Sequence, residues 1–286
     1  MMQASPATIF CYQRAARTLA RRGHHFTKAS VLWDEACARL SERLNESTRD
    51  FPHTLCLAPY APSLPEALLH TGKCSTVHTL GWYRSLPADS YAHPEHVPVG
   101  EASVDAAVCG LALSAINDVP GVFTQLHRAL KPDSMVLISL LGGDTLRELR
   151  EVFAEVETVR SGGISPRVHP FVDVREAGNL LQRTGFNLPV VDRDIITVTY
   201  PDLFALMHEL RMLSATNMLR AQRSNFTSRG FFIDAAKRYA ERYGNDDGTI
   251  NATLEIITLI GWKPHSSQPK PLARGSAKHS LADALK

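Results

Sequence analysis

Two acidic residues are best placed to do chemistry, because each sits where a predicted strand gives way to a helix. Asp144 follows the apolar run 135–141 and two glycines, and Asp118 precedes a helical pattern at 119–130. In open α/β sheets, side chains at the carboxyl ends of parallel strands meet in one cleft, where a carboxylate can act as a general acid or base. Asp144 and Asp118 are therefore our candidate catalytic acids, although their spacing alone identifies no reaction.

A second cluster is His93-Pro-Glu95-His96. A His-x-Glu sequence beside another histidine could contribute to a two-histidine, one-carboxylate iron site. No further ligand can be identified in the sequence, and polar loops that contain proline often carry such residues by chance. We therefore expect no metal site.

The loop after the first predicted strand is informative for what it lacks. Its residues, Ala58-Pro-Tyr60-Ala-Pro62, connect a strand at about 53–58 to a helix at about 64–71. A nucleotide-binding domain places glycines here, because glycine lets the backbone approach the ligand and the helix N-terminus offers free amides. This loop has no glycine, and its prolines remove amide donors. The pattern favours a cofactor cleft that is plugged.

The elements that must position these residues alternate between strand and helix. Apolar strand patterns occur at about 53–58, 75–80, 104–110, 135–141, 188–199 and 252–262. Helical patterns occur at 28–44, 64–71, 119–130, 145–160 and 174–184. This alternation predicts one α/β domain over 28–262 with a mostly parallel sheet. Its strand ends would bring 58–62, 110–117 and 141–144 around one cleft.

Local signals add detail to this outline. Lys131–Ser134 is predicted to be a turn, and Thr145 with Glu148 to form a capping box at the start of a helix. Residues 201–245 read as two or three helices inserted before the last strand. The insertion is rich in arginine and also contains Phe231 and Phe232, which favours a cap that binds a partner over a merely solvated face.

Composition narrows the class of protein. The net charge of +2 is too small to indicate nucleic acid as a general partner, and no apolar run is long enough to span a membrane. The five cysteines lie in the first 110 residues without metal-ligand spacing, as expected for reduced thiols. Residues 1–27 are basic and free of acid, which is typical of a mitochondrial presequence or of a basic surface helix. The tail 263–286 is expected to be poorly ordered.

Several motifs occur together and in order along the chain. They include Gly142-Gly-Asp-Thr-Leu-Arg-Glu-Leu-Arg150, Gly162-Gly-Ile-Ser-Pro166, Asp246-Asp-Gly248 and Ile260-Gly-Trp-Lys263. In these motifs the chain resembles the methyltransferase-like assembly factors of mitochondrial respiratory complex I (the fifth in the usual numbering), which are relatives of bacterial biotin-pathway carboxyl methyltransferases.

The resemblance implies a class I S-adenosylmethionine (SAM) methyltransferase fold and residence in the mitochondrial matrix. It also implies a role early in complex I assembly. The family is associated with hydroxylation of an arginine in an iron–sulfur subunit of the peripheral arm, and with a small twin-cysteine partner protein.

The chain departs from this family at the cofactor site. The acid and glycines of the family's first motif align with Cys56, Ala58, Tyr60 and Pro62. No acid occurs between Glu66 and Asp89 to hold the ribose, and the acid expected near the adenine aligns with His93. Each lost carboxylate would have supplied roughly 1–3 kcal/mol. We therefore assign no cofactor-binding residues, and expect SAM to bind only if the altered loop still functions.

Three hypotheses about function remain open. The first is a catalytically silent assembly factor or structural subunit that binds a peripheral-arm subunit or another assembly factor of complex I. The second is an enzyme, either a SAM-dependent methyltransferase or an arginine hydroxylase, that uses Asp144 and Asp118. The third is a scaffold in another mitochondrial assembly, such as ribosome maturation.

Overall fold

The fold is built on one mixed sheet, seen in a computed structural model that describes residues 8–22, 31–57, 63–213, 215–223 and 225–269. In sheet order its strands are β3 (Ser90–Tyr91), β2 (Thr76–Gly81), β1 (His53–Leu57), β4 (Val104–Gly110), β5 (Leu130–Leu141), β7 (Ile250–Trp262) and β6 (Asn187–Tyr200). The first five run parallel, and β7 runs antiparallel to both of its neighbours. The expected mostly parallel sheet is confirmed.

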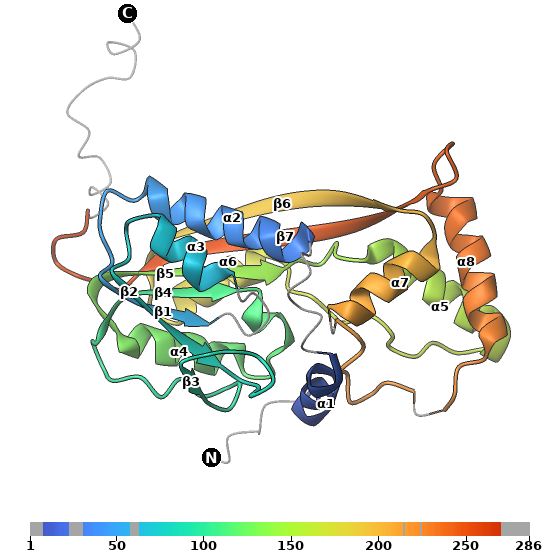
Figure 1. Cartoon of the computed structure of the whole chain (residues 1–286), viewed down its shortest axis with the longest axis horizontal. Coiled ribbons are helices and arrows are strands. Elements are labelled where there is room, and N and C mark those ends of the chain that lie inside the picture. The colour runs from blue at the N-terminus through green and yellow to red at the C-terminus, as the bar shows by residue number, and fades with distance from the viewer. Residues whose placement is uncertain (1–7, 23–30, 58–62, 214, 224, 270–286) are drawn as a thin grey trace, which may run out of the picture.

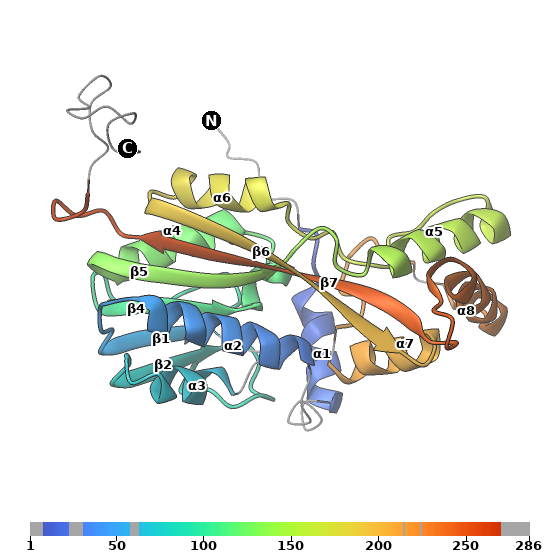
Figure 2. The ribbon, with the colours of Figure 1, turned by 90° about the horizontal axis from the view of Figure 1, so that it is seen from above.

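Side chains alternate between the two faces of each strand, so each face builds its own core. On one face, Leu55 and Leu57 of β1 pack in a cluster with α4 (Val119–Ala129) and α6 (Val174–Arg183). On the other face, Cys56 packs with α2 (Val31–Glu46) and α3 (Leu64–His70). Figure 2 shows these helix pairs on opposite sides of the sheet. Burial on both faces explains why the strands read as continuous apolar runs.

Strands β6 and β7 extend well past the parallel strands and carry an outer lobe (Figure 1). This lobe contains α5 (Arg147–Ser161), α7 (Leu203–Met212) and α8 (Arg229–Tyr243), which share an apolar cluster centred on Phe153, Phe231 and Tyr239. Helices α7 and α8 lie between β6 and β7 in sequence, where the helical insertion was expected.

The N-terminal helix α1 (Tyr12–Arg22) packs into the core between the sheet and the outer lobe. Phe10, Ala15 and Leu19 are buried, and the backbone at Phe10 forms an antiparallel bridge with Leu219. Arg17 and Arg21 are exposed and lie on the outer side of this amphipathic helix.

Two local predictions were wrong in detail. Lys131–Ser134 do not precede β5 but lie inside it, where the pairing with β4 shifts and Asp133 adopts a positive φ of 64°. The capping box is absent because Leu146, not Thr145, occupies the N-cap of α5. The Thr145 hydroxyl instead donates to the Glu255 carbonyl and accepts from the Glu255 amide. Tertiary bonds to β7 have displaced the local cap.

Other boundaries agree with the sequence to within a few residues. Gly162, in the left-handed region at φ 68°, ends α5 as expected. The short strand β3 lies between the strands predicted at about 75–80 and 104–110, where no strand was expected. No described helix is long and apolar enough to cross a membrane. Most of the predicted tail, 270–286, lies outside the described residues.

Candidate functional site

A cavity of about 240 Å³ lies at the carboxyl ends of β4 and β5, where the sequence predicted a cleft. After β4 the chain turns into a short 3-10 helix, Ala112–Ala115, which places Ser114 and Ala115 in the wall. Leu141 at the end of β5 and Trp33 of α2 also line it, and α7 closes it with Met207 and Leu210. The helical insertion therefore covers the strand ends.

The polar side chains that line this cavity form hydrogen bonds mostly with backbone groups of the surrounding protein. Ser114 Oγ accepts from the Leu141 amide at 2.9 Å. His169 Nε2 accepts from the Met218 amide at 3.0 Å, and burial lowers the pKa of this histidine to about 4. The side-chain amide of Asn217 donates to the Pro166 carbonyl. The imidazole is therefore neutral at physiological pH, with Nε2 unprotonated.

The charge of the cavity has one sign. Two arginines, Arg167 and Arg211, are among its described lining residues, and no aspartate or glutamate is. A guanidinium or ammonium group entering this space would lose its hydration without gaining a carboxylate partner. The lining fits an apolar group.

Glu157, which is only 3% exposed, fixes the wall that carries Arg167. It accepts from Arg167 Nη2 at 2.9 Å and from the Ser165 amide at 2.8 Å, and Arg223 lies 3.4 Å away. Burial opposes ionisation of Glu157, but these hydrogen bonds outweigh it and lower its pKa to about 2. The guanidinium of Arg167 also stacks over the Phe231 ring at 4.3 Å.

At the expected SAM position, the described residues offer few free acceptors for the ribose hydroxyls of the cofactor. Cys56 points into the α2–α3 core, and burial raises the pKa of its thiol well above its usual range. Asp89, the first acid after β2, accepts from the Thr79 amide and hydroxyl, both at 2.7 Å. Residues 58–62, including Ala58, Tyr60 and Pro62, lie outside the described residues. The residues that can be seen here do not fit the ribose of SAM.

The segment 8–22 binds across the same end of the sheet as a strap. Asn117 Oδ1 accepts from the amides of Ile9 and Phe10, both at 2.7 Å. The Tyr12 hydroxyl donates to Glu95 at 2.5 Å and accepts from the Asn117 amide at 2.8 Å. The Tyr12 ring also meets His93 edge-on, with centroids 5.3 Å apart. Thus Glu95 and His93, considered above as metal ligands, contact Tyr12.

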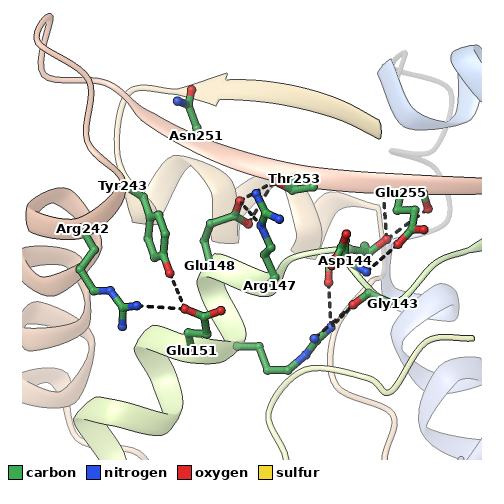
Figure 3. Close-up of polar contacts among 12 residues, drawn as sticks. Gly143, Asp144, Arg147, Glu148, Glu151, Arg242, Tyr243, Asn251, Thr253 and Glu255 are labelled. Atoms are coloured by element: carbon green, nitrogen blue, oxygen red, sulfur yellow. Dashed lines mark hydrogen bonds and ion pairs between the residues drawn. The ribbon is translucent and has the colours of Figure 1, made fainter. Parts of the chain in front are cut away.

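Neither candidate acid lines the cavity. Asp118 caps α4, accepting from the Gly121 amide at 2.9 Å. Asp144 accepts from Arg193 at 2.5 Å. Its amide donates to Glu255 at 2.6 Å, a bond drawn in Figure 3. Both carboxylates thus have structural partners, and the fold does not bring them together at the cavity.

Figure 3 shows that acids of α5 and β7 hold the base of the outer lobe. Glu148 accepts from the Thr253 amide at 3.1 Å and from its hydroxyl, and Arg193 lies 2.5 Å from Glu255. Further along α5, Glu151 accepts from Arg242 and Tyr243 of α8. Glu148 and Glu255 are buried.

Sequence reasoning did not single out Glu157, His169 or Glu255. An acid within the apolar run of the last strand was a usable signal for Glu255, because a buried carboxylate needs a partner. Glu157 and His169 gave no such signal, because each depends on contacts between distant segments. No three His, Cys, Asp or Glu side chains in the described ranges are grouped so as to hold a metal ion.

Sequence comparison identifies close relatives over most of the chain. The chain is 36% identical over 283 residues to the mitochondrial arginine-hydroxylase NDUFAF5 of Mus musculus, covering 96% of the chain and 82% of that protein. The Homo sapiens protein of the same name is 34% identical over 300 residues, with 98% and 84% covered. A malonyl-[acyl-carrier protein] O-methyltransferase of Xylella fastidiosa is 38% identical over 201 residues, with 70% and 64% covered.

The methyltransferase fold is supported by a family model and by solved structures. A model described as a methyltransferase domain matches residues 86–138. The YcgJ protein of Bacillus subtilis superposes with a TM-score of 0.52 at 12% identity, covering 81% of this chain and 99% of that one. At this identity the likeness concerns the fold alone, which is the α/β, class I methyltransferase-like architecture predicted from the sequence.

Proposed function

Since the chain belongs to the family of the mitochondrial arginine-hydroxylase NDUFAF5, we propose that it is a protein-binding assembly factor or structural subunit for respiratory complex I. It would act in the mitochondrial matrix on a peripheral-arm subunit or another assembly factor, without binding SAM. The methyltransferase fold would then serve as a scaffold, and the outer lobe as the part that contacts the partner.

The observation that carries this proposal is the uncharged end of β1. Cys56 stands where the family has an acid, and its thiol is fully buried among Cys37, Leu64 and Leu68. Between Glu66 and Asp89 the sequence offers no replacement, and Asp89 already accepts two hydrogen bonds from Thr79. Without carboxylates for the ribose hydroxyls, SAM would lose roughly 1–3 kcal/mol for each missing charged hydrogen bond.

Titration calorimetry of the full chain with SAM tests the loss of the cofactor. We expect no saturable heat of SAM binding by this chain. The positive control is the malonyl-[acyl-carrier protein] methyltransferase of Xylella fastidiosa, which should bind SAM at the same concentrations. Micromolar binding by this chain would refute the silent assembly factor.

Affinity purification of the tagged protein from mitochondria tests the partner. We expect peripheral-arm subunits or assembly factors of complex I to co-purify. Recovery of ribosomal proteins instead would favour a scaffold in ribosome maturation, and would contradict our proposal.

The second candidate is an enzyme that hydroxylates arginine, which is the activity that the NDUFAF5 relatives are named for. The lining of the cavity disfavours this activity, because no described lining residue is a carboxylate that could pair with the guanidinium of a substrate arginine. Mass spectrometry of complex I subunits, from cells with and without the gene for this chain, distinguishes the silent assembly factor from the hydroxylase. A hydroxylated arginine that disappears on deletion and returns with the wild-type chain would establish the enzyme.

A further inference from the structure

A groove of about 520 Å³ runs along the outer side of the wall that closes the cavity. The same residues, Arg167, Val168 and His169, line both spaces. The outer groove is bounded by α5 through Arg150 and by Arg220 of the segment that pairs with the strap. It is thus assembled from four segments of the chain, namely 8–9, 150–154, 164–170 and 219–221.

The groove carries positive charge that the described protein does not neutralise. Arg150 donates to the carbonyls of Gly143 and Thr145, without a carboxylate among its described contacts. The side chain of Arg220 is exposed, and no hydrogen bond or ion pair joins it to a described residue. No aspartate or glutamate is among the residues that line the groove. Arginine forks of this kind favour carboxylates, which they can bind through two parallel hydrogen bonds.

The rest of the groove offers contacts that suit a polypeptide. Ile9 and Ile164, both lining residues, are 44% and 68% exposed. The amides of Val168 and His169 donate no hydrogen bond to the described residues. A bound segment could therefore bury apolar side chains against the isoleucines while its backbone carbonyls reach these amides.

We propose that this groove binds an acidic, apolar-containing segment of a partner protein, with carboxylates at Arg150 and Arg220. The inference rests on the proposed role as a protein-binding assembly factor, and it specifies the partner's chemistry. RNA is the less suitable occupant, because single-stranded bases stack on aromatic side chains whereas the exposed rim is aliphatic.

Fluorescence polarisation with the full chain tests this inference. The probes are a short labelled peptide of alternating glutamate and leucine, its glutamine–leucine counterpart and a labelled RNA oligonucleotide. We expect only the glutamate peptide to bind, with affinity that falls as salt is added. Arg220→Glu should weaken it about tenfold, since one favourable charge contact becomes repulsive. Ile164→Asp should weaken it as well.

Arg183→Glu is the matched control, because it reverses an exposed arginine on α6. It should leave binding unchanged, and thermal unfolding should show that all variants fold. Equal binding of the two peptides, preference for RNA, or an unchanged affinity in Arg220→Glu would each overturn the inference.

The groove and the proposed function can fail separately. If complex I proteins co-purify equally with wild type and Arg220→Glu, the groove is not the docking surface, although the function stands. If no complex I protein co-purifies but the glutamate peptide still distinguishes the variants, the groove stands and its partner belongs to another assembly.

Discussion

At the scale of single residues, the cavity wall is held by two groups, His169 and Glu157, whose protonation states are set by their surroundings. His169 is neutral because burial lowers its pKa, and its Nε2 needs to stay unprotonated to accept from the Met218 amide. Glu157 is ionised because Arg167 and Ser165 outweigh its burial. The two groups act in different pH ranges, so each gives its own prediction.

We predict that the free energy of unfolding decreases as the pH falls from about 6.5 to about 4, because burial in the folded chain disfavours protonation of His169. The pKa of His169 is about 4 in the folded chain, below the usual 6.5. Its contribution to the free energy of unfolding is therefore complete above pH 6.5 and is lost as the pH falls from 6.5 through the folded pKa. The loss amounts to at most about 3 kcal/mol. Urea denaturation across this range should show the slope, and His169→Gln should flatten it. A ring that titrates near 6.5 by NMR would contradict the prediction.

Glu157 should act at lower pH. Its pKa falls from 4.5 to about 2 on folding, so its stabilisation is present above pH 4.5 and lost as the pH falls towards 2. Glu157→Gln should cost about 3–5 kcal/mol at neutral pH, because it leaves the half-buried Arg167 without its anion. Chemical denaturation measures this, with the exposed Glu176→Gln as control. A cost below 1 kcal/mol would mean that Arg167 finds another partner.

At the scale of elements, the strap shows how one side chain can join distant segments. Asn117 holds the amides of Ile9 and Phe10, while the neighbouring residue Asp118 caps α4. Sequence reasoning placed the segment that ends at Asn117 beside the cleft and considered Asp118 a cleft acid. It could not assign the partners, because they lie more than a hundred residues away in the chain.

We predict that Asn117→Ala loosens the strap without unfolding the sheet. It removes an acceptor shared by two amides, at a cost of about 1–3 kcal/mol. Hydrogen–deuterium exchange should rise over residues 9–15 and remain unchanged in β4 and β5. Asn187→Ala is the control, because the side-chain amide of Asn187 donates to Gln268, which is not part of the strap. Uniformly faster exchange would show that Asn117 supports the whole domain instead.

The elements that could be predicted are those whose sequence patterns depend on neighbouring residues alone. Apolar runs identified the central strands, because strands buried on both faces need no polar residues. The capping box at Thr145 failed since β7 offers that hydroxyl two backbone bonds. The shift within β5 was missed for a similar reason, as it depends on pairing with β4 and on bonds from Arg49 and Gln268 to Asp133.

At the scale of the whole molecule, the strap bears on where the folded domain begins. The sequence suggested a boundary between 1–27 and 28–262, because the first segment is basic and free of acid. The packing of α1 supports a different proposal, in which residues 8–22 remain part of the working protein. Phe10 and Leu19 are 6% and 1% exposed, so removing them would uncover apolar core.

Deletion of residues 1–22 tests this proposal. Loss of two large buried side chains alone should lower the free energy of unfolding by at least about 3 kcal/mol. Urea denaturation measures it, and deletion of residues 1–7 serves as the comparison. Equal stability of all three chains would place the start of the domain after the strap, as the sequence first suggested.

The strap also constrains the order in which the chain can fold. Arg14 donates to the Leu219 carbonyl, a contact that joins residues 205 positions apart. Closing so large a loop is entropically costly and slow, and residues 218–220 leave the ribosome long after residue 14. Helix α1 should therefore be among the last elements to dock, and until it docks its apolar side, with Ala15 and Leu19, stays uncovered.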